Sequence, residues 1–358
     1  MRRATLLVLG GVAACVATVV PSEPILAHGG TDVDVTSDYR TRITDVTNVD
    51  GLQARTIGLD GIIEVTWTGS GSLVVSGYQG EPYLRFDDTG VARNARSPAT
   101  YLNEDRYANV DLPASADADA EPDWEPVTSA ASYQWHDHRT HWMSSSPPPQ
   151  VSRADDRAHV IYERWEIQLV VDGEAAVIAG DLVWAPPPSP APWIALTVVV
   201  ALAAGLALWS RWWRPAAALL AALGTAALVV DTLGYVTLID DTVANQLWAF
   251  NFAVLALAAT LRLAVHASRR TAEPTLAMML AGPVLVVIGG LDRIDVFTSG
   301  FYLSSFPAAL GRLTTAISLG IGAGLSARFL AFLVPLLVRS PTPQSTSAEL
   351  VTRPADPM

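Results

Sequence analysis

The sequence predicts an all-β exported domain, an antiparallel immunoglobulin-like sandwich, followed by an all-α domain of five transmembrane helices. Three observations predict this arrangement. The chain of 358 residues begins with a short basic and then apolar segment, which is typical of a secretory signal. Its first half is polar and acidic. From Trp193 onward it consists mainly of apolar runs that are long enough to cross a bilayer.

Residues 1–27 are predicted to be a signal peptide that is cleaved after Ala27. Two alternatives stay open: a lipobox that ends at Cys15, and an uncleaved anchor. Cleavage after Ala27 would make His28 the first residue, and its free amine and imidazole could then chelate one metal ion together. The other interpretation of His28 is a disordered start, because chain termini are often poorly ordered.

Residues 28–185 are predicted to form the exported β domain. Short stretches rich in β-branched residues and separated by turn signals indicate antiparallel strands. They include a hairpin around Asp60-Gly61 within residues 52–68, a strand pair within 72–86, and strands 160–169 and 176–184 joined at Asp172-Gly173. Residues 87–132 are predicted to be a long irregular stretch. The proline-rich residues 186–192 indicate a stiff linker.

Residues 193–339 are predicted to be the membrane domain. Its five helices are expected near residues 193–209, 216–235, 246–265, 275–291 and 313–338. Arginines such as Arg211 and Arg214 lie in alternate loops, whereas Asp240, Asp241 and Asp292 lie in the others. Because basic loops face the cytoplasm, this pattern predicts a multi-pass cell-membrane protein with the β domain outside and a disordered cytoplasmic tail at 340–358.

Composition excludes several classes of function. The formal net charge of −12 argues against nucleic-acid binding, which needs a basic surface. The one cysteine, Cys15, lies within the predicted signal peptide. A mature chain without cysteine could hold no disulfide, thiolate zinc site, iron–sulfur cluster or blue-copper centre.

The segment from Trp135 to Met143 holds three of the six histidines: His136, His138 and His141. Clustered imidazoles with a nearby carboxylate are typical of a metal site. In an extended strand His136 and His138 share one face, and His141 joins them only if a turn or bulge intervenes. Further candidate ligands are His28 and, less favoured, Met143 and His159. Asp137 is expected to orient a coordinating histidine.

The donor set predicts the metal. A site rich in imidazole and free of thiolate suits a copper or zinc ion. We favour copper, with zinc as the alternative. The opposing interpretation is that both tryptophans of the segment are core residues and that the histidines are ordinary polar residues.

Polar residues within the membrane domain gather near its predicted outer end. Asp231 and Arg312 are the candidate ion pair, because ionisable groups inside a membrane are usually paired. Ordinary capping at the membrane interface is the alternative. Gly320, Gly322 and Gly324 provide a spacing of small residues that lets helices pack closely.

Three segments carry a resemblance: Pro82-Tyr-Leu-Arg-Phe86, Ser97-Pro-Ala-Thr-Tyr-Leu-Asn103, and Trp135 to Met143. Together they resemble a group of uncharacterised actinobacterial exported, multi-pass membrane proteins, and the resemblance implies no established activity. An exported β domain with an N-terminal histidine and a membrane part is faintly similar to periplasmic copper-resistance proteins. This chain has fewer helices than the fused copper-resistance type and no matching intramembrane motif.

Three classes of function follow from the sequence. The first is a membrane-anchored extracytoplasmic metal-binding protein. The second is a structural or interaction module of a membrane complex that uses no metal. Its histidine segment would dock a membrane protein partner or the membrane surface through its aromatic residues. The third, the least favoured, is an enzyme such as a copper oxidase or zinc hydrolase, for which Asp137 is the one adjacent acid or base.

Overall fold

The computed structural model describes residues 36–59, 61–151, 156–238, 250–269 and 275–338. The predicted signal peptide, His28 and the predicted tail at 340–358 lie outside these residues. The chain divides into a β-rich unit, residues 1–188 with 299–303, and a helical unit formed by the remainder. The return of residues 299–303 to the β-rich unit was not predicted.

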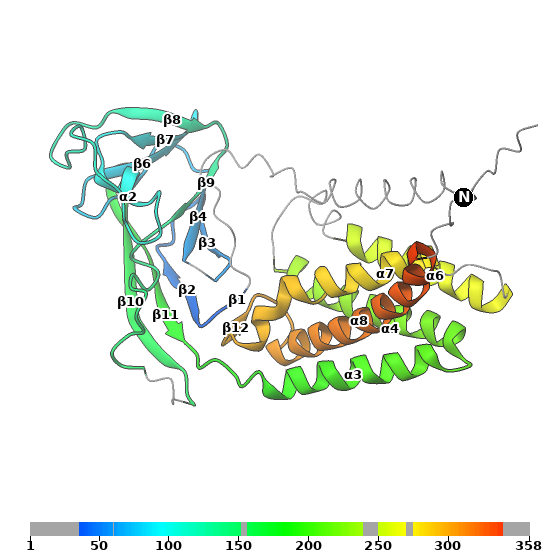
Figure 1. Ribbon diagram of the computed structural model, residues 1–358. Helices are drawn as coiled ribbons and strands as arrows, with labels where there is room; N and C mark the ends of the chain where they lie inside the picture. The colour runs from blue at the N-terminus through cyan, green and yellow to red at the C-terminus, as the bar shows by residue number, and fades with distance from the viewer. Residues whose placement is uncertain (1–35, 60, 152–155, 239–249, 270–274, 339–358) are drawn as a thin grey trace, which may run out of the picture. The chain divides into compact units, whose positions relative to one another are not determined.

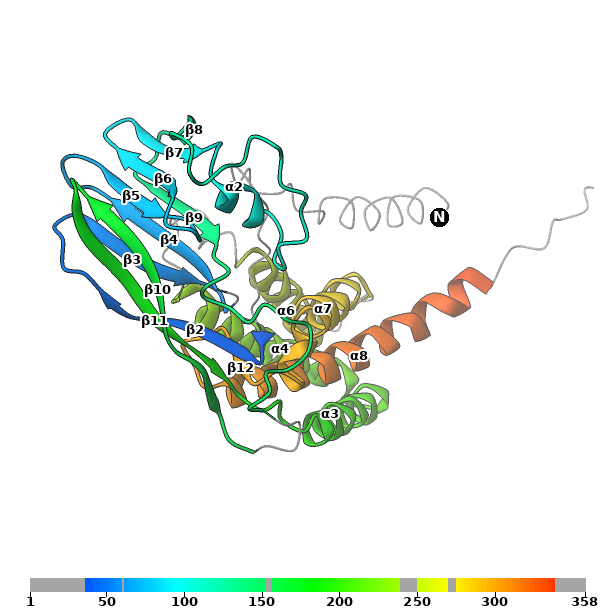
Figure 2. The same ribbon diagram turned by 90° about the vertical axis from the view of Figure 1, so that its left-hand side faces the viewer.

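The β-rich unit is built from antiparallel sheets (Figures 1 and 2). A three-stranded sheet has the order β3-β4-β9, and a seven-stranded sheet has the order β2-β11-β10-β5-β6-β7-β8. The three-stranded sheet contains β3 (Leu52–Ile57), β4 (Ile62–Trp67) and β9 (Ser132–His136). The larger sheet contains β2 (Tyr39–Val46), β5 (Leu73–Ser76), β6 (Pro82–Asp87), β7 (Gly90–Asn94), β8 (Trp124–Thr128), β10 (His159–Val171) and β11 (Glu174–Trp184).

Both sheets contribute to one core. Ile63, Val65 and Trp135 from the smaller sheet are buried in the same cluster as Phe86 and Ile167 from the larger one. Period-2 alternation produces this burial, because every second side chain of each strand points to the same face. The unit is therefore an antiparallel β structure with a common core. Its strand order does not confirm the predicted immunoglobulin-like topology.

Two predicted hairpins are confirmed. Strands β3 and β4 pair through Ile57 and Ile62. Strands β10 and β11 are joined at Asp172 and Gly173, whose φ values of 49° and 90° are those of a type I′ turn. The predicted pair within residues 72–86 is also present as β5 and β6.

The prediction of a long irregular stretch at residues 87–132 is wrong. It contains β7, β8 and the short helix α2 (Pro98–Leu102). Strands of five residues give little alternation to detect, and Pro126 interrupts β8. That proline is tolerated because β8 is the edge strand of its sheet. Helix α2 is capped by the Ser97 hydroxyl, which accepts a hydrogen bond from the Ala99 N–H.

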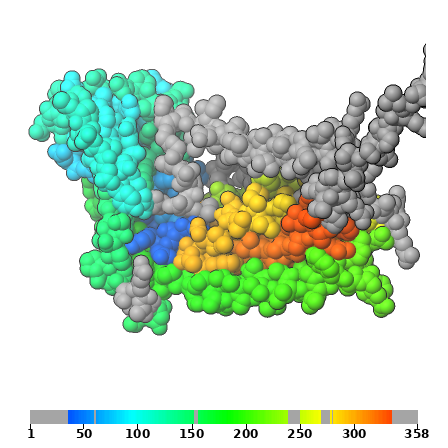
Figure 3. Space-filling model, viewed as in Figure 1, coloured from blue at the N-terminus to red at the C-terminus, as the bar shows by residue number. Residues whose placement is uncertain are grey.

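The helical unit contains five α-helices and one 3-10 helix among the described residues. They are α3 (Ala191–Trp209), α4 (Trp213–Val236), α6 (Asn251–Arg269), α7 (Thr275–Val287), the 3-10 helix η1 (Leu291–Phe297) and α8 (Ala308–Val338). Four of them, α3, α4, α6 and α8, are long and apolar enough to cross a membrane. Helix α3 lies along one face of this unit, where it is green in Figure 3, and most of its apolar surface is exposed.

The count of five spanning helices is not confirmed, because α7 has 13 described residues and contains Pro283. At 1.5 Å per residue it is about 20 Å long, whereas a bilayer core is about 30 Å thick. The predicted close packing at the small residues of α8 is confirmed. A Cβ atom on Gly322 would lie 2.8 Å from the backbone of Val286, and one on Gly324 would lie 2.7 Å from the Cβ of Ala204.

One strand pair of the β-rich unit joins distant parts of the sequence. Strand β1 (Thr36–Ser37) pairs with β12 (Phe301–Tyr302), so that Thr36 lies opposite Tyr302. The Gly300 N–H donates a hydrogen bond of 2.8 Å to the Asp38 carboxylate. Residues 299–303, within the connection between η1 and α8, therefore belong to the β-rich unit.

Candidate functional site

A turn at the end of β9 brings the three histidines of the segment together. His136 is the last residue of β9 and pairs with Ile62 of β4. The chain then reverses, because the Thr140 N–H donates to the Asp137 carbonyl at 3.0 Å. The Thr140 hydroxyl donates to the carbonyls of Asp137 and Gly61, at 2.6 Å each. The turn that His141 needed in order to join the other two histidines is therefore present.

We call His136, His138 and His141 the histidine cluster. The rings of His136 and His141 are stacked, with centroids 4.3 Å apart and planes inclined by 15°. The His138 ring is nearly perpendicular to both, at 6.4 Å from His136 and 5.6 Å from His141. His136 is 7% and His141 is 2% exposed. Three imidazoles thus share one largely buried site.

Backbone contacts indicate which ring nitrogens carry protons. His138 Nε2 lies 2.9 Å from the Asp105 carbonyl, and His141 Nδ1 lies 3.2 Å from the Trp142 carbonyl. A carbonyl oxygen only accepts, so each of these nitrogens is the protonated donor. The second nitrogen of each ring, Nδ1 of His138 and Nε2 of His141, then carries a lone pair that can bind a metal.

The Nε2 atom of His141 is the most informative atom of the cluster. It is buried and has no hydrogen-bond partner among the residues that the structure describes. Burial, together with the neighbouring His136 and Arg106, lowers the pKa of His141 to about 3. The ring is therefore neutral at physiological pH, which is the form in which an imidazole binds a metal.

The expected role of Asp137 in orienting a coordinating histidine stays a prediction. Its carboxylate accepts hydrogen bonds of 2.8 Å from Arg139 Nε, Arg139 Nη2 and Trp135 Nε1. Burial acts to raise the pKa of this carboxyl, but the Arg139 guanidinium and these hydrogen bonds hold it below its ordinary value. The buried pair fixes the turn between His136 and His141.

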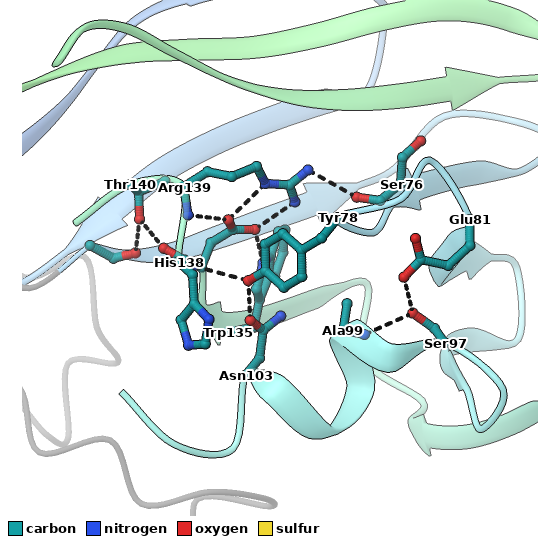
Figure 4. A network of polar contacts seen from close by, with 12 residues as sticks. Ser76, Tyr78, Glu81, Ser97, Ala99, Asn103, Trp135, His138, Arg139 and Thr140 are labelled. Atoms are coloured by element: carbon teal, nitrogen blue, oxygen red, sulfur yellow. Dashed lines mark hydrogen bonds and ion pairs between the residues drawn. The ribbon is translucent and has the colours of Figure 1, made fainter. Parts of the chain in front are cut away.

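Three residues next to His138 were not predicted: Tyr78, Asn103 and Asp105. The Tyr78 ring stacks on the His138 ring, with centroids 5.6 Å apart and planes inclined by 11°. Its hydroxyl accepts from the His138 N–H at 3.0 Å and donates to the Asn103 side chain. Figure 4 shows this network, with the Arg139 side chain above the Tyr78 ring. Asn103 is the last residue of one of the three segments that carry the resemblance. That position was the one feature of the sequence that could have pointed to Asn103 as a site residue.

The other candidate ligands lie apart from the cluster or outside the described residues. His159 begins β10, and its ring packs against Trp184 with centroids 6.0 Å apart. Met143 is half-buried, two residues after His141. His28 lies outside the described residues. A role for these three residues as further ligands of the cluster stays a prediction.

The cluster is not arranged as a closed metal site. Within the described part of the chain, no group of three His, Cys, Asp or Glu residues could hold a metal ion as placed. The stacking explains this, because parallel rings send their lone pairs in parallel directions rather than toward one point. Binding would require one of the two stacked rings to rotate.

A groove of about 680 Å³ opens beside the cluster. It is lined by His138, Arg139 and residues 161–166 of β10. Glu163, Arg164 and Glu166 are exposed there, and the guanidinium of Arg164 pairs with Glu166 at 2.6 Å. The groove gives solvent access to the side of the cluster that His138 occupies.

In the helical unit, Asp231 forms an ion pair of 3.7 Å with Arg293 of η1. The Thr314 hydroxyl donates to the same carboxylate at 3.5 Å. Arg312 donates from Nε to the Val296 carbonyl at 3.0 Å. The proposed partnership of Asp231 with Arg312 stays a prediction, whereas Arg293 is a partner that the sequence did not indicate.

Comparisons with protein-family models, curated protein sequences and solved structures returned no match for this chain. The resemblance to actinobacterial membrane proteins stays a prediction.

Proposed function

We propose that the chain is a membrane-anchored protein whose β-rich unit lies outside the cytoplasm and binds a divalent metal ion through the histidine cluster, with copper favoured over zinc. The observation that carries the proposal is the buried, unpartnered Nε2 of His141 beside two other imidazole rings. A buried polar atom without a partner is rare, and a bound ion is one of the ordinary reasons for it.

The donor chemistry supports copper or zinc. All three rings are imidazoles, and the bonds of His138 and His141 to backbone carbonyls leave the second nitrogen of each ring as the one that can bind an ion. Backbone carbonyls that orient metal-binding histidines in this way are a common feature of metal sites. A rotation of His136 or His141 out of the stack would aim two lone pairs at one ion, and the amine and ring of His28 could complete the coordination.

Metal binding is tested by calorimetric titration of the full chain in detergent micelles with Cu²⁺ and separately with Zn²⁺. We expect one ion per chain with micromolar or tighter affinity, lost in His138→Ala and His141→Ala. His266→Ala is the matched control, because His266 lies in α6 of the helical unit. Absence of binding by the native chain, or an equal loss in the control, would refute the proposal.

The β1–β12 pair supports five membrane crossings. Residues 299–303 belong to the β-rich unit, so the chain must return to the side of that unit before α8 begins. Four α-helices of the described residues, α3, α4, α6 and α7, lie between β11 and that point. A return to the starting side needs an even number of crossings, so α7, extended by residues on either side, would cross as well. The C-terminus would then be cytoplasmic.

Cysteine labelling tests this topology. The background is Cys15→Ser, which removes the one native cysteine. Thr298→Cys and Arg211→Cys then place a thiol at two exposed positions. We expect an impermeant maleimide to label the first in intact cells and the second only after permeabilisation. The reverse pattern would overturn the proposed orientation.

The second candidate function is an interaction module without a metal. It is favoured by the groove beside His138 and by the packing of the histidines against one another and against backbone carbonyls. A photocrosslinking residue at Glu163, which lines the groove, would capture a partner membrane protein in cells. The same residue at Gln168, exposed on β10 but outside the groove, is the control and should capture none.

A further inference from the structure

One end of the helical unit gathers positive charge around a single indole ring, that of Trp213 at the start of α4. The guanidinium carbon of Arg214 lies 5.2 Å from the ring centroid, and that of Arg328 from α8 lies 5.3 Å from it. The His266 ring of α6 lies 6.2 Å away. We call Trp213, Arg214, His266 and Arg328 the Trp213 cluster.

Within the described part of the chain, the two arginines of the cluster have no anionic partner. Neither side chain forms an ion pair or a hydrogen bond with any of the residues that the structure describes, and the Nε atom of each is buried. Arg328 is surrounded instead by aromatic rings, with Phe332 at 4.6 Å and Trp209 at 5.2 Å from its guanidinium carbon.

Aromatic rings alone do not satisfy a guanidinium. They attract its charge, but they accept none of its five N–H hydrogen bonds. A buried donor without an acceptor is costly, and the cost is larger for a charged group. The start of α4 adds to the positive potential, because it has no side-chain cap and helix N-termini carry a partial positive charge. Arg262, one turn before His266 on α6, adds a further charge.

We propose that the Trp213 cluster binds the phosphodiester group of an anionic membrane phospholipid. Planar guanidinium groups match phosphate oxygens, so Arg214 and Arg328 would each donate hydrogen bonds to one bound phosphate. This binding site is independent of the histidine cluster and of metal.

The surroundings favour a lipid as the source of the phosphate. Trp209 is 53% and Trp212 is 63% exposed beside the cluster, and exposed tryptophans are typical of the level of lipid headgroups. The helices that meet here, α3, α4, α6 and α8, are the four that are apolar enough to cross a membrane. Acyl chains could therefore lie along them while the headgroup occupies the cluster.

A different reading makes Arg328 a purely structural cation held between aromatic rings. It predicts no ligand, whereas the lipid site predicts selective binding. The loop before α4 offers a matched control in Arg211. Its guanidinium carbon lies over Trp212 at 5.3 Å, and it carries the same charge at the same end of the unit, but it does not contact Trp213.

The test is a titration of the delipidated full chain, in a neutral detergent, with phosphatidylglycerol or phosphatidylcholine, followed by native mass spectrometry. We expect selective binding of phosphatidylglycerol. Arg214→Gln and Arg328→Gln should each weaken it by about tenfold, the lower end for a charge-assisted hydrogen bond. Arg211→Gln should change it by less than about twofold, as expected for an exposed charge. If Arg328→Gln fails to fold, Arg214→Gln at the end of its helix carries the test.

Four results would overturn the proposal. Equal binding of both lipids would show that charge is not recognised. Equal weakening by Arg211→Gln would show general surface attraction rather than a built site. Displacement of phosphatidylglycerol by inorganic phosphate at comparable concentration would show a site for soluble phosphate instead of lipid. Retention of selectivity in both Arg→Gln variants would equally exclude the cluster.

Discussion

Removal of the Asp137 carboxylate tests whether the buried pair with Arg139 holds the histidine turn. The Asp137 side chain is fully buried and accepts four hydrogen bonds, three from side-chain N–H groups and one of 3.0 Å from the Arg139 backbone N–H. Asp137→Ala leaves a guanidinium that is 21% exposed without its carboxylate, and it leaves the Trp135 indole N–H without its acceptor.

The magnitude follows from what remains. Removing one partner of a buried ion pair costs about 3–5 kcal/mol, because the other charge stays buried and uncompensated. Arg139 keeps a hydrogen bond of 3.2 Å to the Ser76 carbonyl and a position 5.1 Å from the Tyr78 ring centroid. These contacts place the expected cost near the lower end, about 3 kcal/mol. That is a large part of the 5–15 kcal/mol by which domains are ordinarily stable.

The measurement is urea unfolding of the full chain in detergent, followed by hydrogen exchange in peptides from β4 and β9. Asp156→Ala is the matched control, because its pair with Arg157 is 3.8 Å long and both side chains are at least 89% exposed. Such a pair contributes at most about 1 kcal/mol. If Asp137→Ala shifts the midpoint no more than Asp156→Ala does, the reasoning about the buried pair is wrong.

Two further predictions concern the backbone and the β1–β12 region. Gly61→Ala should destabilise the β-rich unit by about 2 kcal/mol, because φ at this position is +77° and the added Cβ atom would lie 2.7 Å from the Thr140 hydroxyl oxygen. The same unfolding assay measures this cost. Gly80→Ala has a similar φ and no neighbour within 4 Å, so an equal cost there would refute the steric argument. Burial raises the pKa of Asp38, although the Gly300 N–H acts to lower it, so the charged form is disfavoured in the folded state. Asp38→Asn should therefore raise the melting temperature at pH 7. The gain should disappear below about pH 4, because the Asp38 carboxyl of the native sequence is then protonated in both the folded and the unfolded state. A gain in melting temperature that persists in acid would contradict this cause.

The strands that sequence could predict were those with long or well-bounded alternation. The hairpin at Asp172-Gly173 carries two strands of more than ten residues and a turn dipeptide that favours positive φ. Strand β8 has five residues and an internal proline, so its pattern resembles that of a loop. Its pairing with β7 depends on the sheet already being in place, which is tertiary information.

The candidate site was predictable in its residues but not in its geometry. Spacing along a strand placed His136 and His138 on one face and left His141 opposite. The turn at Thr140, which reverses that parity, is held by hydrogen bonds to Gly61 and to Thr41, which lies 99 residues earlier in the chain. Such long-range contacts leave no periodic signal, and neither does the stacking of Tyr78 on His138.

The membrane part shows the same division between local and long-range information. Hydropathy alone located α3, α4, α6 and α8, because each contains an apolar run of at least 18 residues, which is within the range of a membrane crossing. It could not locate the return of residues 299–303 to the β-rich unit, since a two-residue strand such as β12 has no pattern of its own. Yet that pair is the observation on which the proposed topology rests. In that proposal α7 is counted as a crossing, although it has 13 described residues and an internal proline, because an even number of crossings before α8 would return the chain to the side of the β-rich unit.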